Sequence, residues 1–144
     1  MLNAARSCWK CGVSTAVFAF GLPKGHQTFD DDREEGGSWQ RADVAAIPYY
    51  IEFLAENVQQ RMRVLAPCYR LDFSKTTQSR YWMNHCERCD MKQGDFELFC
   101  EPDVAFLPFS ARRAAEIRVE EVRDPFEAFA GEYTYGVEFL EERR

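Results

Sequence analysis

The sequence predicts an α+β fold, a small antiparallel sheet with one long helix, and three observations support this prediction. Short segments rich in β-branched and aromatic residues lie between Gly and Pro positions, as strands do. One longer segment has apolar residues at helical spacing. Two C-x-x-C pairs each adjoin strand-like sequence. The 144 residues, 46% of them hydrophobic, can bury one core, so we expect a single domain over residues 1–144.

The first expected strand is Thr15–Phe20, which is β-branched and aromatic throughout. An acidic run, Asp30–Glu35, follows and is closed by two glycines. We interpret it as a solvated loop, because a calcium-binding EF-hand loop would need Gly and Glu where Glu35 and Arg41 stand.

The long helix is predicted over Pro48–Leu65. Its apolar residues recur at steps of three and four: Tyr50, Phe53, Leu54, Val58, Met62 and Leu65. Pro48 is tolerated in a first turn, and Pro67 ends the helix. We expect the apolar stripe to face the core.

Four further elements complete the expected order along the chain. Strands are predicted at Tyr69–Phe73, Phe96–Cys100 and Ile117–Val122, and a helical turn at Ala111–Glu116.

The two C-x-x-C pairs, Cys8 with Cys11 and Cys86 with Cys89, have the spacing of metal ligands. Such a turn, here called a knuckle, directs two thiolates into one small volume, and two knuckles give the tetrahedral set that Zn²⁺ prefers. We therefore predict one structural Zn²⁺ per chain, with no open coordination position for catalysis. Disulfides or a thioredoxin-like redox pair at residues 8–11 are the alternatives.

Seventy-four residues separate Cys11 from Cys86, more than a compact zinc ribbon has. The ribbon is thus predicted to be split, with halves at 6–20 and 81–100 and a helical insertion at 26–80. Closing so long a loop costs entropy that grows only slowly with length, so metal binding can offset it.

Other thiol and imidazole groups have weaker patterns. Cys68 and Cys100 are interpreted as small apolar packing residues. His85 adjoins Cys86, which makes it an alternate ligand, and a Cys68–His85 hydrolase pair is a further alternative. Neither residue lies in a nucleophile motif, so we predict that the protein is not an enzyme.

The segments CWKCG at the N-terminus and YRLDFSKTTQSRYWMNHCERCDMKQGDF over Tyr69–Phe96 resemble a group of small uncharacterised bacterial proteins. These look like split zinc ribbons with an N-terminal CWxC and a later NHCxxCxxxQGDF. The resemblance covers the first knuckle and roughly Ile47–Pro108, and it implies the metal site but no activity. Asp90 stands where such proteins often have Gly, and Asp also tolerates a left-handed backbone.

The net charge is −6, and four thiolates with one Zn²⁺ would make it about −8, which disfavours non-specific DNA coating. The stretch Arg61–Lys92 differs, with a net +4 interleaved with aromatic residues. Its candidate contacts to single-stranded RNA or DNA are Arg61, Arg63, Arg70, Lys75, Arg80, Tyr81 and Trp82. The alternative is that the aromatic residues pack in the core.

Three functions stay open. We favour a protein-binding adaptor that contacts another protein, by analogy with other zinc ribbons. The others are a nucleic-acid-binding module and an acidic inhibitor that mimics nucleic acid. No membrane partner is expected, because no apolar run approaches the length of a span. Paired cysteines without a convincing signal peptide predict a cytoplasmic location. The sequence does not indicate an oligomeric state.

Overall fold

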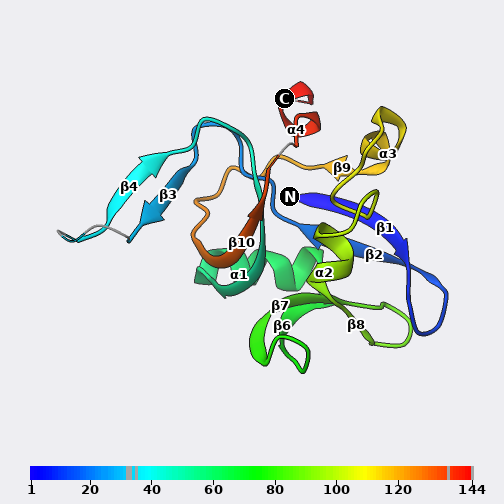
Figure 1. The fold of residues 1–144 in the computed structure, drawn as a ribbon. Helices are drawn as coiled ribbons and strands as arrows, with labels where there is room; N and C mark the ends of the chain where they lie inside the picture. The colour runs from blue at the N-terminus through cyan, green and yellow to red at the C-terminus, as the bar shows by residue number, and fades with distance from the viewer. Residues whose placement is uncertain (32–33, 35, 136, 144) are drawn as a thin grey trace.

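The computed structural model describes residues 1–31, 34, 36–135 and 137–143, and these form an α+β fold of antiparallel sheets (Figure 1). The first sheet has the order β2-β1-β9, with β1 at Leu2–Ser7, β2 at Ser14–Ala19 and β9 at Arg118–Val119. The second has the order β10-β5-β7-β6, with β8 on the side of β7; its strands are β5 Ile47–Leu54, β6 Tyr69–Ser74, β7 Ser79–His85, β8 Lys92–Gln93 and β10 Ala128–Thr134. The helices are α1 Glu56–Leu65, α2 Asp95–Phe99, α3 Ala111–Glu116 and α4 Phe139–Glu142.

Strand β2 lies between two hydrophobic clusters, which confirms the predicted buried strand. Val17 and Ala19 pack into a cluster with α2 and the C-terminal segment. Phe18 and Phe20 point the other way, into a cluster with β5 and α1. Because successive side chains of a strand alternate between faces, burial on both faces requires the uninterrupted apolar run that the sequence has.

The prediction of one long helix over Pro48–Leu65 is wrong. Residues Ile47–Leu54 form strand β5, and only the ten residues Glu56–Leu65 form helix α1. Apolar steps of three and four residues also fit a β-strand with a bulge, and the pairing of β5 with β10 shifts register between Phe129 and Ala130. β-Branched and aromatic residues in β5 pack well on a sheet, and tertiary pairing overrides the helical spacing.

The apolar residues expected to form one buried stripe do not all face the core. Leu54, Val58 and Met62 are buried, but Phe53 is 50% exposed. Phe53 lies opposite Phe129 of β10, which is also exposed. The side chain of Phe53 therefore lies on the outer face of the sheet.

Of the remaining predicted elements, some are confirmed and others are wrong. Strand β6 and helix α3 confirm the predictions at Tyr69–Phe73 and Ala111–Glu116, the latter with Ser110 as its N-cap. The strand predicted at Phe96–Cys100 is wrong, because these residues follow Gly94 into the short helix α2. The strand predicted at Ile117–Val122 is confirmed only for the two residues of β9.

A third sheet, the two-stranded hairpin of β3 (Gln27–Asp30) and β4 (Ser38–Arg41), projects from the molecule (Figure 1). We call it the hairpin arm. The acidic run predicted as a loop follows from Asp30, but Asp32, Arg33 and Glu35 lie outside the described residues. The stretch 26–80 thus contains the arm, β5, α1 and β6 rather than mainly helix. In the part of the chain described here, no helix has the length and apolar character to cross a bilayer.

Candidate metal centre

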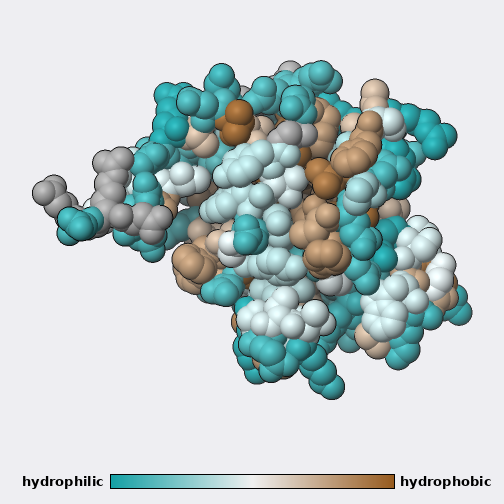
Figure 2. Space-filling model, in the orientation of Figure 1, coloured by the Kyte–Doolittle hydropathy of each residue, from teal (hydrophilic) through white to brown (hydrophobic). Residues whose placement is uncertain are grey.

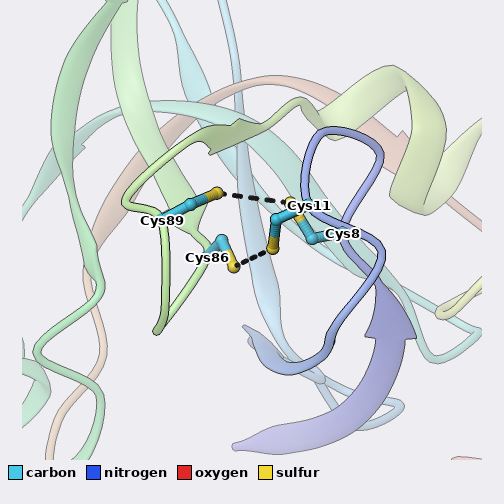
Figure 3. Close-up of side chains that lie close together, drawn as sticks. All are labelled: Cys8, Cys11, Cys86 and Cys89. Carbon is cyan, nitrogen blue, oxygen red and sulfur yellow. Dashed lines mark hydrogen bonds between the residues drawn. The ribbon is translucent and has the colours of Figure 1, made fainter.

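The four predicted ligands converge, although 74 residues separate the two pairs (Figure 3). Cys8 and Cys11 lie in the turn between β1 and β2, and Cys86 and Cys89 lie in the turn between β7 and β8. The four Sγ atoms lie within 4.8 Å of one another. Each knuckle therefore joins two antiparallel strands; the sequence predicted strand-like sequence beside each pair, but not strands β1 and β8.

The two knuckles have the same backbone hydrogen bonds. Cys8 donates its N–H to Val13 O and accepts from Gly12 N–H, each at 2.9 Å. Cys86 forms the equivalent bonds to Met91 O and from Asp90 N–H, also at 2.9 Å. Gly12 and Asp90 both have a left-handed backbone, with φ of 72° and 60°. Two short segments far apart in sequence thus present their sulfur atoms in the same way.

The sulfur separations fit a tetrahedral metal ion. Sγ of Cys8 lies 3.6 Å from Sγ of Cys89, and Sγ of Cys11 lies 3.7 Å from Sγ of Cys86. A tetrahedral metal with metal–sulfur bonds of about 2.3 Å would hold its sulfur atoms about 3.8 Å apart. The separations are far longer than the roughly 2.05 Å of a disulfide, and the structure has all four as free cysteines. Two of the six sulfur separations are thus close to the tetrahedral value and all lie within 4.8 Å, so the four cysteines could hold a metal ion.

The pKa values of the thiols show what a cation would change. Backbone N–H groups of Cys11 and Lys10 hold the pKa of Cys8 at about 6, despite desolvation. The N–H of Met91 lowers the pKa of Cys89, but desolvation and the three neighbouring sulfur atoms outweigh it and raise the pKa to about 11. Four thiolates so close repel one another, and a bound cation would remove this penalty.

Two side chains surround the sulfur cluster and tie the knuckles together. Gln93 is fully buried and donates its amide N–H to Cys8 Sγ at 3.3 Å and to Met91 O at 2.9 Å. Trp9 donates its indole N–H to Lys92 O at 2.7 Å. Such second-sphere donors orient metal ligands and stabilise thiolate charge.

The two halves are also joined outside the cluster. The side chain of Asn84 in β7 is buried and forms two hydrogen bonds to Phe18 in β2, accepting from its N–H at 2.8 Å and donating to its C=O at 3.0 Å. Glu87 donates its N–H to Thr15 Oγ1 at 3.0 Å. At Phe18, the side chain of Asn84 therefore forms the two hydrogen bonds that a neighbouring strand would otherwise form with β2.

Asn84, Gln93 and Asp95 had no predicted role, yet all three lie in the NHCxxCxxxQGDF segment. Asp95 is buried at the start of α2 and accepts the N–H of Tyr50 at 2.8 Å. Tyr50 has an unusual φ of 51° for a bulky residue. Burial raises the pKa of Asp95 to about 7. In the sequence, these three polar residues flank the second knuckle, and that position could have predicted that they form buried hydrogen bonds there.

His85 and the other two cysteines lie apart from the sulfur cluster. His85 is buried, with Nε2 2.8 Å from Asp72 Oδ2 and Nδ1 3.1 Å from the carbonyl oxygens of Cys68 and Met83. Both ring nitrogens are thereby engaged, so His85 is not positioned as a metal ligand. His85 contacts the backbone oxygen of Cys68 and not its thiol. This geometry does not support the suggested Cys68–His85 hydrolase pair.

Most of the proposed nucleic-acid residues are either close to acidic side chains or buried. Arg61 and Arg70 form ion pairs with Asp124 and Asp90, and Arg63 lies 4.0 Å from Glu56. Lys75 and Arg80 are exposed near the turn between β6 and β7. Tyr81 and Trp82 are buried, with rings against Tyr50 and Tyr69 respectively.

The chain was compared with protein families, curated proteins and solved structures. No protein-family model, curated protein or solved structure matches the chain.

Proposed function

We propose that this protein is a protein-binding module whose fold is stabilised by one zinc ion at Cys8, Cys11, Cys86 and Cys89. Four thiolates in tetrahedral spacing favour Zn²⁺ among the common metals. They also fill its coordination sphere, which supports a structural rather than a catalytic role. Free thiols in such a site need a reducing compartment, so a cytoplasmic location belongs to the same proposal.

The observation that carries protein binding is the hairpin arm. Phe29 of β3 pairs with Trp39 of β4, with ring centroids 5.3 Å apart. Both rings lie on the projecting arm and are 54% and 62% exposed. A cross-strand aromatic pair can stabilise a hairpin, and exposed aromatic side chains are also enriched among the anchors of protein interfaces. Figure 2 shows the arm standing clear of the molecular body.

The arm presents these rings in a defined position. A side chain at Gly37 would collide with the ring of Phe29, so the glycine allows that ring to lie close over the backbone. Gln40 also donates to Asp30 across the hairpin at 2.9 Å. Acidic residues at the same end, including Asp31 and Glu34, favour a partner with a basic surface.

Binding of single-stranded nucleic acid through Arg61–Lys92 is the second candidate. The burial of Tyr81 and Trp82 leaves them unable to stack on bases without unfolding, and acidic partners neutralise Arg61 and Arg70. Mimicry of nucleic acid is the third, and it would use the same acidic surface on a basic site of another protein. We rank both behind an interface centred on the arm.

The test is a comparison of the native chain with Phe29→Ser/Trp39→Ser and with Phe109→Ser, which removes an exposed aromatic ring outside the arm. Each is cross-linked in cells that produce the protein, and the captured protein is identified, purified and titrated against all three chains. We expect saturable binding to the native chain and to Phe109→Ser, and at least tenfold weaker binding to the arm variant. Equal affinities for all three chains would contradict the proposal. Tight, salt-sensitive binding of single-stranded oligonucleotides would put the second candidate first.

A further inference from the structure

Strand β1 has an edge that its neighbour covers only in part. On one side β1 pairs with β2 over its whole length, Leu2–Ser7. On the other side β9 pairs only with Leu2 and Asn3, because the chain before Arg118 turns away into helix α3. Residues Ala4–Ser7 therefore continue the sheet without a neighbouring strand among the described residues.

The direction of the backbone groups on this edge follows from two observations. Met1 and Glu120 exchange N–H···O=C bonds in both directions, which places the polar groups of Met1, and hence of Asn3, on the side of β9. Phe18, which lies opposite Asn3, directs its own N–H and C=O away from β1 to Asn84. By alternation, Ala5 and Ser7 also direct their N–H and C=O groups toward the open edge.

These groups are available to a partner. Ala5 is exposed, and no group within the described residues pairs with its N–H or C=O. Among the described residues, the C=O of Ser7 accepts only from the neighbouring Arg6 Nε, at 3.1 Å. Unpaired backbone groups in a row are the feature that a second strand recognises.

The open edge borders a hollow of about 660 Å³, within the range of ligand-binding pockets. Val104 and Ala105, which are partly exposed, contribute apolar surface to it. Its charged lining consists of Arg6, Glu97, Asp103, Arg113 and Glu116. Both arginines form ion pairs with acids of the lining. Three acids and two arginines give the lining a net charge of −1.

We propose that the open edge of β1 at Ala5–Ser7 receives an extended peptide segment of a partner protein, which adds to the sheet in line with β9. The segment carries an apolar side chain for the surface of Val104 and Ala105, and a Lys or Arg that balances the excess acid. This inference rests on the proposed function as a protein-binding module and adds a second contact surface to the hairpin arm.

A peptide fits this edge better than a second copy of the chain. The edge is recessed between α2, α3 and the segment around Asp103–Ala105, which all line the same hollow. Two copies paired edge to edge would have to bring both sets of flanking helices into that space. A single extended segment needs only the width of one strand, about 4.8 Å.

The test uses the native zinc-loaded chain, Ala5→Pro and Ala5→Val. Proline removes the N–H of Ala5, one of the two that face the open edge, and leaves the β1–β2 pairing intact, whereas valine keeps the N–H and suits a strand. A displayed library of short random peptides is selected on the native chain, and enriched peptides are titrated against all three chains. We expect enriched peptides with alternating apolar and basic residues, about tenfold weaker binding to Ala5→Pro, and unchanged binding to Ala5→Val. Melting temperature and zinc content confirm that each variant is folded.

Hydrogen exchange on the native chain gives a second readout that needs no variant. Peptide binding is expected to slow exchange of the Ala5 and Ser7 amides. No enriched peptide, equal binding to Ala5→Pro, or no added protection at Ala5 would overturn the inference, as would a dimer that Ala5→Pro dissociates. If a captured partner requires Phe29 and Trp39 but ignores Ala5→Pro, the proposed function stands and the edge inference fails.

Discussion

At Gly12 and Asp90 the same backbone geometry is reached by different residues. Each follows the second cysteine of its knuckle and has a positive φ, and each donates its N–H to the first cysteine of the pair. Gly has no Cβ to oppose this conformation, and Asp is among the residues that tolerate it. The spacing C-x-x-C and a turn-compatible residue after it were enough to predict both knuckles from the sequence.

Replacing a ligand is predicted to cost far more than replacing another thiol. Cys8→Ser removes one of four metal ligands, and we expect it to destabilise the protein by more than about 3 kcal/mol. Cys68→Ser changes a half-buried thiol outside the cluster, and we expect about 1 kcal/mol or less. Urea unfolding of the metal-loaded proteins measures both. Similar losses for the two variants would contradict a metal-linked role for Cys8.

Asp95 is predicted to make stability depend on pH. Its folded-state pKa of about 7 lies above the ordinary value of 3.8 for an aspartate, so the folded protein holds a proton that the unfolded chain releases. This contribution is fully present below about pH 4 and is lost as pH rises to about 7, a loss on the order of 4 kcal/mol. Asp95→Asn keeps an acceptor for Tyr50 N–H but cannot ionise.

We therefore expect Asp95→Asn to gain stability relative to the native protein between pH 5 and pH 7.5. Comparing the two proteins at each pH cancels effects of metal binding that both share. Chemical unfolding at the two pH values measures the difference. A constant difference would show that Asp95 does not titrate in this range.

At the scale of elements, local patterns predicted β2, β6 and the two knuckles, but not the transition from β5 to α1. Tyr50, Leu54 and Val58 satisfy helical spacing, but β5 is specified by its partners β10 and β7, which lie far along the chain. Pairing with distant strands is not visible in a window of neighbouring residues. The turn at Gly94 and the aromatic residues after it likewise predicted a strand over Phe96–Cys100, where helix α2 forms.

The strand assignment of β5 has a direct test in Phe53→Asp and Leu54→Asp. On a helix both positions would belong to the same apolar stripe. In the structure Phe53 is half-exposed, while Leu54 is fully buried. We expect Phe53→Asp to cost about 1 kcal/mol or less through its contact with Phe129, and Leu54→Asp to unfold the protein. Thermal melting and solubility distinguish these outcomes; loss of folding in both variants would support the helix instead.

For the whole molecule, the sequence predicted that two distant segments meet, but not what holds them together besides sulfur. Contacts such as Asn84 with Phe18 and Gln93 with Cys8 cross more than sixty residues of sequence. They depend on sheet positions that only the complete fold defines. The hairpin arm was also missed, because its strands are short and border an acidic run that has no strand-like pattern.

The central claim is that one zinc ion bound by four cysteines joins the two halves of the molecule. Elemental analysis of the purified, reduced protein together with X-ray absorption at the metal edge measures both stoichiometry and ligands. We expect one zinc per chain, with four sulfur neighbours at about 2.3 Å. A folded protein without bound metal, or a zinc ion with fewer than four sulfur neighbours, would contradict it.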